Sequence, residues 1–498
     1  MSKVLLFLPP YPGQSLGPPA SLLCLAAPLL QSGYEVEIID AALVPSYLEV
    51  IESKLENALC FGVTLLTGPM IEGAVKAARL VKSASPHVPV VFGGWHPSLM
   101  AEQTLQERFV DIVVRNQGEI TFLELVQRIE SGRGFDEVAG CSFKTGTTVH
   151  HNSDRAVASL STLPTPAYDL VDFDAYEKAT GERKLPYASS VGCPYACNYC
   201  TDTVFYNRRF NAHAAQRVVD EVTNLVARHR LNEVALLDSN FLVDTQRAVQ
   251  IARGFLDAGA GFLWTFQTST DLICRLSDEE VLLLGESGVE HIGFGVESGS
   301  NRVLSDMNKR HQRVEDVFEA ARKCRQAGIR ATFNVILGFP GETALDRQQT
   351  FKLMGEVASR YDNVTFSANI FTPYPGIPIW PKLREMGLKV PCRLEDWTAF
   401  ALGANLLPWL KGAVNRRIAR GISLFTLSNK VRKSMWNTSL SPRAGMMLRG
   451  IERSLHFRMK HDLMSWPLEQ WLLKTQVSGS GHSLYRGQAP PHRLGAGS

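Results

Sequence analysis

Long apolar runs are missing from this chain of 498 residues. Because a membrane-spanning helix needs about 18 or more consecutive apolar residues, we expect no transmembrane segment. The apolar start, Val4–Leu8, is cut short by Pro9 and Pro10 and lacks a small-residue cleavage site, so we expect a buried strand there. A net charge of only +3 argues against a nucleic-acid binder. The composition predicts a cytoplasmic protein of two or three domains.

The cysteine pattern lacks the features of a disulfide framework and of a closed zinc site. Nine cysteines in a large chain without a secretion signal indicate a reducing compartment, where thiols stay free or bind metal. Cys193, Cys197 and Cys200 share one loop with no further Cys or His nearby, whereas structural zinc needs four ligands. Three thiolates can instead bind three irons of a 4Fe–4S cluster and leave the fourth iron open. The others are expected to be small buried side chains: Cys24, Cys60, Cys141, Cys274, Cys324 and Cys392.

Residues 1–145 alternate short apolar runs with amphipathic stretches, which we interpret as helices beginning near Ala20, Ile71, Glu102 and Thr121. The expected strands between them are Val4–Leu8, Glu35–Ile39, Cys60–Thr64, Val88–Phe92 and Asp111–Val114. Buried β-branched strands separated by helices predict an α/β domain with a doubly wound, Rossmann-like parallel sheet.

Three of these strands end in loops that suit a ligand. Ligands on such sheets bind at the carboxyl ends of the strands, where glycine allows close approach to the backbone. The loops are Thr64-Leu65-Leu66-Thr67-Gly68-Pro69, Gly93-Gly94-Trp95-His96-Pro97-Ser98 and Gln117-Gly118-Glu119. Each loop alone is typical of a simple turn, but three on one rim favour a bound ligand.

Residues 146–184 are predicted to be a linker, since the prolines of Leu163-Pro164-Thr165-Pro166 keep the chain extended. Residues 185–397 then repeat a strand–helix rhythm without a Rossmann fingerprint, which predicts a partial (β/α)6 barrel with its site at the top face. The expected strands are Tyr187–Ser190, Glu233–Leu237, Phe262–Gln267, His291–Gly295, Ala331–Leu337 and Val364–Ile370.

The rhythm stops near residue 398, and residues 398–477 are predicted to be a basic, α-rich C-terminal region. Between residues 411 and 462, twelve Lys and Arg face only Glu452 and Asp462. Helical spacing places Arg449, Arg453, His456 and Lys460 on one face and Met447, Ile451, Leu455 and Met459 on the opposite face. Such a helix either lies on an anionic membrane surface or packs on the barrel with a solvated basic face. Residues 478–498, rich in Gly, Ser and Pro, are expected to be disordered.

The spacing Cys193-x3-Cys197-x2-Cys200, with Tyr199 before the last cysteine, resembles the defining motif of the radical S-adenosylmethionine enzymes. Segments farther along resemble the same family: Glu233–Phe241, Gly295–Gly299, Met307–Arg310, Ile336–Thr343 and Thr372–Pro378. In this family the open iron chelates S-adenosylmethionine, and one electron from the cluster cleaves it to a 5′-deoxyadenosyl radical. The resemblance implies that Tyr199 borders the adenine and that Glu297 bonds the ribose or the amine. It also implies contacts from Asp238, Ser269 and Gly338, although Asp238 is equally typical of a helix cap.

The first domain resembles the cobalamin-binding domain that precedes the radical domain in one branch of this family. The resemblance is carried by Gly93-Gly94-Trp95-His96-Pro97 and by Arg115-Asn116-Gln117-Gly118-Glu119, although Asn116-Gln117 departs from the usual Gly-Glu-Gly-Glu. No Asp-x-His-x-x-Gly is present, so we expect no histidine ligand to cobalt from that motif. A strand-end histidine such as His96 more often bonds backbone or ligand. The resemblance implies cobalamin as a cofactor, with contacts from Thr64, Gly68, Gly93, Gly94, His96 and Glu119.

Methyl transfer to an unactivated carbon of a lipid, a tetrapyrrole or another natural product is the first expectation, with methylcobalamin as the methyl donor. The alternative is a radical cyclase or ring-rearranging oxidoreductase, like the anaerobic tetrapyrrole cyclase that the chain also resembles. A third reading is an iron–sulfur electron-transfer protein, and the barrel segments beyond the cysteines count against it. The expected partners are a small-molecule or lipid substrate and an external one-electron reductant such as a flavodoxin or ferredoxin.

Overall fold

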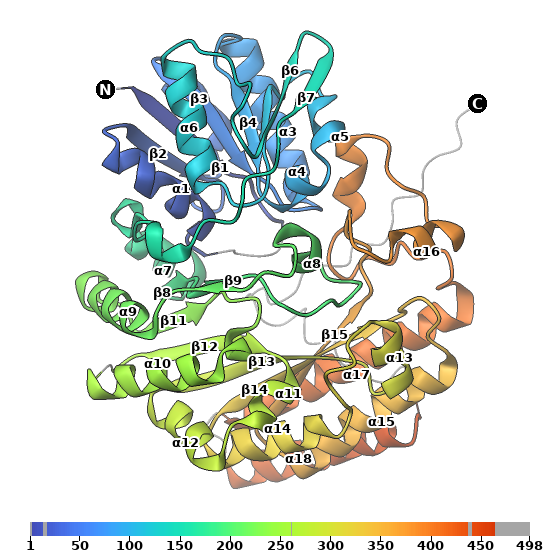
Figure 1. The fold of residues 1–498 in the computed structure, drawn as a ribbon. Helices are drawn as coiled ribbons and strands as arrows, with labels where there is room; N and C mark the ends of the chain where they lie inside the picture. The colour runs from blue at the N-terminus through green and yellow to red at the C-terminus, as the bar shows by residue number, and fades with distance from the viewer. Residues whose placement is uncertain (1, 13–16, 260, 437–440, 464–498) are drawn as a thin grey trace.

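Two separate sheets organise the chain, one within its first 151 residues and one between residues 184 and 370 (Figure 1). The structure is a computed structural model that describes residues 2–12, 17–259, 261–436 and 441–463. None of the helices in these ranges combines the length and the apolar character needed to cross a membrane.

The first sheet has the strand order β2-β1-β3-β4-β5-β6-β7. Its strands are β1 (Lys3–Leu8), β2 (Glu35–Asp40), β3 (Ala58–Thr64), β4 (Val90–Gly93), β5 (Ile112–Val114), β6 (Cys141–Thr145) and β7 (Thr148–His151). Its helices are α1 (Ala20–Gln31), α2 (Tyr47–Lys54), α3 (Met70–Ala84), α4 (Trp95–Leu99), α5 (Ala101–Leu105) and α6 (Glu119–Glu130). The first five strands are parallel, as predicted, and β6 and β7 add an antiparallel hairpin that the sequence analysis missed. The sheet therefore continues past the expected boundary at residue 145.

The predicted linker is ordered and attached to both sheets. It contains η1 (Leu160–Thr162), η2 (Tyr168–Leu170) and α7 (Phe173–Thr180). The hydroxyl of Tyr168 donates to the carbonyl of Pro186 in the second sheet, and the hydroxyl of Tyr176 donates to Asp40 at the end of β2. Buried tyrosines with satisfied hydroxyls fix the segment between the two sheets.

The second sheet consists of six parallel strands in the order β15-β14-β13-β12-β11-β8, an open partial barrel as predicted. The strands are β8 (Lys184–Tyr187), β11 (Glu233–Leu236), β12 (Leu263–Thr268), β13 (Val289–Glu297), β14 (Arg330–Leu337) and β15 (Val364–Ile370), with a small antiparallel pair of β9 (Ser190–Val191) and β10 (Asn211–Ala212). The helices around it are α8 (Asp202–Phe205), α9 (Ala215–His229), η3 (Phe241–Val243), α10 (Thr245–Asp257), α11 (Thr270–Arg275), α12 (Asp278–Glu286), α13 (Asn301–Asp306), α14 (Asp316–Gln326) and α15 (Ala344–Arg360).

After β15 the chain returns to the first domain before it reaches the C-terminal helices. This return segment contains α16 (Trp380–Glu385) and η4 (Leu394–Ala399). The indole of Trp397 is fully buried in the core of the first domain and donates to Gln103 at 2.7 Å. Residues 394–400 therefore pack with the first sheet, although the expected barrel segment ran to residue 397.

Of the C-terminal helices, α17 (Gly412–Trp436) covers the open edge of the barrel at β15, and α18 (Pro442–Lys460) packs against α15 and α17. The amide of Asn429 bonds both backbone groups of Phe366 in the edge strand β15. The buried guanidinium of Arg432 donates to the carbonyls of Ala358, Tyr361 and Val364. Pairing with side chains protects an edge that would otherwise offer free backbone groups.

The expected division of α18 into a basic and an apolar face holds only in part. Arg449, Arg453 and Lys460 are exposed and Leu455 and Met459 are buried. His456, however, is buried and bonds Ser428, and Met447 and Ile451 are exposed. The cause is that α15 and α17 occupy the inner side of the helix, so burial follows their contacts. The segment 478–498, expected to be disordered, lies outside the described residues, as does 464–477.

Candidate active site

The loop that carries the three cysteines is held at its start by specific contacts. Gly192 has φ +75°, and a Cβ there would collide with the carbonyl oxygen of Arg209, so only glycine fits. At the start of the loop, the carboxylate of Asp238 accepts hydrogen bonds from Ser189 and Ser190 at 2.5–2.9 Å. Burial raises the pKa of Asp238 to about 6. The loop is thus fixed before any ligand binds, which suits a metal site.

Asp238 therefore holds the loop and neither caps a helix nor lines the cavity beside the cysteines. Its position at the end of β11 suggested contact with S-adenosylmethionine. The neighbouring Ser239 and Asn240 line that cavity instead.

The three cysteine side chains line a cavity of about 250 Å³, here called the cluster cavity. Burial raises the pKa of Cys200 to about 12 and also raises the pKa of Cys193 and Cys197. Bound metal deprotonates such thiols. Within the described ranges, no three His, Cys, Asp or Glu side chains are grouped closely enough to hold a single ion. Each cysteine of a cluster binds a different iron, so three thiols spread around one cavity fit a cluster with one open iron.

Glu297 faces the cysteines at the end of β13. Its Oε1 accepts a hydrogen bond from the ammonium of Lys309 at 3.1 Å. Its φ is +64°, at a bulge in the pairing of β13 with β14, and a Cβ on Gly295 would lie 2.5 Å from its carboxylate. The strained backbone and the glycine together place a buried charged pair against the cavity. Such strain concentrates at functional sites.

Lys309 is a buried cation within this cavity. Burial lowers its pKa, but the charges of Glu297 and of the thiols outweigh burial and raise it overall. The ammonium therefore stays charged, and it can form an ion pair with an additional anionic group that binds in the cavity. The carboxylate of an amino acid is one such group.

The other predicted S-adenosylmethionine residues divide into two groups. Tyr199 and Ser269 line the cluster cavity. Gly338 does not: Leu410 covers the position of its missing Cβ, and the indole of Trp409 donates to its carbonyl at 2.9 Å. Its contact with the nucleoside stays a prediction that this arrangement does not support.

Several polar lining residues were missed by the sequence analysis. Asn240 lies 4.0 Å from the sulfur of Cys193 and accepts a hydrogen bond from Thr268. Gln267 and Asn334 project from β12 and β14 into the same space. The available signal was an amide within a strand of a parallel sheet, since such strands are usually rich in apolar side chains.

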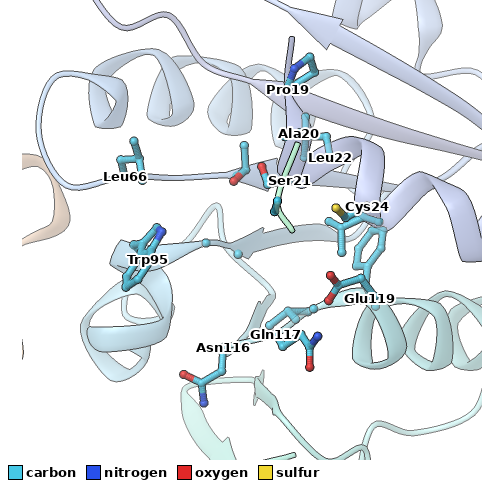
Figure 2. Close-up of a pocket in the computed structure, with 18 of the residues that line it drawn as sticks. Pro19, Ala20, Ser21, Leu22, Cys24, Leu66, Trp95, Asn116, Gln117 and Glu119 are labelled. Carbon is cyan, nitrogen blue, oxygen red and sulfur yellow. The ribbon is translucent and has the colours of Figure 1, made fainter. Parts of the chain in front are cut away.

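A second cavity of about 450 Å³ lies between the first domain and the barrel and is here called the inter-domain cavity. In the order β2-β1-β3-β4-β5 the direction of winding reverses between β1 and β3, and ligands bind at that switch point. Leu8 at the end of β1 and Thr64 at the end of β3 line the cavity. Figure 2 shows Leu66 and Trp95 on one side of it and Cys24 and Glu119 on the other.

Four of the predicted cobalamin residues line the inter-domain cavity and two do not. The four are Thr64, Gly93, Gly94 and Glu119. Gly68 packs against the carbonyl of Phe400, and His96 is fully buried between Thr67, which bonds its Nδ1 at 2.9 Å, and the ring of Trp397. Burial lowers the pKa of His96 to about 3, so the imidazole is neutral. Its position does not support ligation of cobalt.

The barrel contributes one wall of the inter-domain cavity, which the sequence analysis did not foresee. Phe205 at the end of α8 and the following Tyr206 line it, and Phe205 packs against Trp95 with ring centroids 4.2 Å apart and the ring planes tilted by 35°. Ser239 lines both the inter-domain cavity and the cluster cavity. The two cavities therefore share Ser239 in their walls.

Two of the scattered cysteines also depart from expectation. Cys24 lines the inter-domain cavity, where burial and the charge of Glu119 raise its pKa, and Cys392 is exposed.

Comparison with known proteins assigns both halves of the chain. The radical SAM superfamily matches residues 187–354, and the B12 binding domain matches residues 14–126. An uncharacterised methyltransferase of Pyrococcus horikoshii is 30% identical over 440 residues, which cover 86% of this chain and 93% of the relative. An anaerobic magnesium-protoporphyrin IX monomethyl ester cyclase of Rubrivivax gelatinosus is 26% identical, covering 75% of this chain and 67% of the relative.

Among solved structures, the cobalamin-dependent S-adenosylmethionine radical enzyme OxsB with aqua-cobalamin bound superimposes with a TM-score of 0.73 at 18% identity. The match covers 96% of this chain and 75% of OxsB. The fold class predicted from the sequence, a doubly wound sheet followed by a partial barrel and an α-rich C-terminal region, is confirmed.

Proposed function

Because the chain belongs to the cobalamin-dependent radical S-adenosylmethionine enzymes, we propose that it transfers a methyl group to an unactivated carbon of a small molecule or lipid. Its cofactors are then a 4Fe–4S cluster, S-adenosylmethionine and cobalamin. When bound, the cluster supplies the electron that cleaves S-adenosylmethionine, and cobalamin supplies the centre that carries the methyl group.

The observation that carries the proposal is the contact of the two cavities at Ser239. Radical formation and methyl delivery must reach the same carbon, so the two cofactors need adjoining spaces. A protein that only carried electrons would have no need for a second, larger cavity beside the cluster. A substrate bound at Ser239 would reach both spaces.

The chain's own residues bind and orient the cofactors. Cys193, Cys197 and Cys200 hold the cluster, while Glu297 and Lys309 present one anion and one cation to the amino and carboxyl groups of S-adenosylmethionine. Tyr199 and Ser269 complete that space. On the other side, Thr64, Gly93, Gly94 and Glu119 contact cobalamin.

The apolar lining of the inter-domain cavity suits a reaction that must be kept from water. Its surface is mainly apolar, with Leu8, Leu66, Trp95 and Phe205 among the contributors. A dry cavity protects a reactive radical from other hydrogen donors. Apolar walls also favour an apolar substrate, so we propose a lipid, a tetrapyrrole or another natural product. An external one-electron reductant, such as a flavodoxin or ferredoxin, completes the set of partners.

A deletion strain tests the reaction and the substrate class together. Mass spectrometry of its small molecules and lipids is expected to show a compound lighter by one methyl group, and restoring the gene should restore the methyl group. The cyclase is the second candidate, favoured by the similarity to the magnesium-protoporphyrin relative. Loss of a ring without loss of a methyl group would support the cyclase and contradict methyl transfer.

A further inference from the structure

The outward face of α18 is more apolar than a solvent-exposed helix should be. Met446 is 69% exposed, Met447 63% and Phe457 56%, and a Cβ on Gly450 would meet nothing within 4 Å. Scattered exposed apolar residues are ordinary, but these belong to one helix. A single ridge at helical spacing is formed by Arg443, Met446, Met447, Gly450, Ser454 and Phe457.

Basic residues flank this ridge and acidic residues do not. Arg449, Arg453 and Lys460 are exposed along one side of it. The only acidic residue of α18 is Glu452, which is buried and pairs with Arg432 at 2.6 Å. The next acidic residue, Asp462, pairs with Arg417 of α17. The exposed face therefore carries positive charge alone.

The inner side of α18 already makes the contacts that hold the helix. Leu455 and Met459 are buried against the barrel core, and His456 bonds Ser428. Figure 1 shows α18 along the outside of the barrel, on the side away from the first sheet. The fold thus needs nothing from the outer ridge and leaves it free for another surface.

We infer that the outer face of α18 docks the protein on an anionic lipid surface. Apolar side chains between arginines are what a helix lying in the plane of a membrane interface requires: the apolar atoms enter the acyl boundary and the cations meet the headgroups. A second copy is disfavoured, because a self-contact would place the same arginines together. Residues 464–498 are disfavoured as the cover, because Glu469 is their only acidic residue. This inference does not depend on the reaction proposed above.

Flotation of the purified full chain with vesicles tests it. We expect binding to vesicles of phosphatidylglycerol and phosphatidylcholine in equal parts, and none to phosphatidylcholine alone. Each basic residue near a charged membrane contributes a few-fold in affinity, so Arg449→Glu with Arg453→Glu should weaken binding at least about tenfold. Met446→Ser with Phe457→Ser should weaken it comparably, since it removes the apolar insertion.

The matched control is Arg108→Glu with Arg133→Glu, the same charge change at exposed positions of the first domain, which should bind like the unaltered chain. Thermal melting should be unchanged in all three variants, because none of the altered side chains is buried. Equal vesicle binding by the unaltered chain and the α18 variants would overturn the inference. So would a dimer in sedimentation velocity that Met446→Ser with Phe457→Ser converts to a monomer, since that face would then belong to a second copy.

Discussion

The two adjoining cavities differ in the kind of side chain that shapes them. The cluster cavity is small and is lined by thiols, amides and the buried pair of Glu297 and Lys309. The inter-domain cavity is larger and is lined by glycines, prolines and apolar or aromatic side chains. Charged and metal-ligating side chains define the first cavity, whereas apolar surface and backbone shape define the second. A substitution in one cavity should therefore impair the binding of one cofactor and leave the binding of the other unchanged.

Removal of the cluster ligands gives the largest expected effect. Cys193→Ala with Cys197→Ala and Cys200→Ala should abolish the iron–sulfur absorbance and reduce 5′-deoxyadenosine to the level of a blank, because these three are the cysteines that line that cavity. Cobalamin binding, measured by absorbance after reconstitution, should persist. Cluster absorbance or 5′-deoxyadenosine in the triple variant would contradict the ligand assignment.

Neutralising Glu297 should have the second-largest effect, a loss of affinity for S-adenosylmethionine. Glu297→Gln removes a charged acceptor and leaves Lys309 without its partner, so affinity for S-adenosylmethionine should fall roughly 10- to 100-fold while the cluster still assembles. Anaerobic equilibrium dialysis measures this. The matched control is Glu290→Gln at the other end of β13, where the side chain pairs with Arg330 at the surface. Equal losses in both variants would show that Glu297 acts only through the fold.

Substitution of a glycine in the inter-domain cavity should weaken cobalamin binding and leave the cluster unchanged. Gly94 has φ +90° and ψ −165°, and a Cβ there would lie 3.0 Å from the backbone of Leu65. Gly94→Ala therefore strains the loop by about 1–3 kcal/mol, which predicts roughly tenfold weaker cobalamin binding with normal cluster content. The control is Gly132→Ala, also at positive φ but with open space around it. Loss of the cluster in Gly94→Ala would contradict the expectation that each cavity serves a different cofactor.

Substitution of His96 should have the smallest effect on cofactor binding. It is neutral when buried, with a pKa of about 3, and takes up a proton near its usual pKa of about 6.5 once unfolded. Its contribution to stability is therefore present above pH 6.5 and is lost as the pH falls below that value. His96→Phe should flatten the fall in stability between pH 6.5 and 4 by up to about 1.4 kcal/mol per pH unit, measured by denaturant unfolding.

The cobalamin absorbance spectrum of His96→Phe tests whether His96 contacts the cofactor. Because His96 faces Thr67 and Trp397, cobalamin should bind with unchanged affinity and absorbance. A shifted spectrum in His96→Phe would show that the imidazole reaches the cobalt.

The sequence predicted the cysteine loop, five of the six strands of the barrel sheet and the rim of the first sheet, because local patterns encode them. The first barrel strand was expected at Tyr187–Ser190, which shares only Tyr187 with β8. It did not predict which strand-end residues face a cavity. Gly338 and His96 are covered by Leu410 and Trp397, which come from far along the chain. Ser239 was missed for the same reason, since its role depends on how the two domains meet. Contacts of long sequence separation leave no local pattern.

The central claim is that the two cavities serve one reaction. It is tested most directly with the reconstituted, reduced chain, S-adenosylmethionine carrying a deuterated methyl group, and a small-molecule extract of the deletion strain. We predict a product that carries the deuterated methyl group, together with S-adenosylhomocysteine and 5′-deoxyadenosine in equal amounts. Substrate-dependent 5′-deoxyadenosine without S-adenosylhomocysteine or labelled product would contradict it.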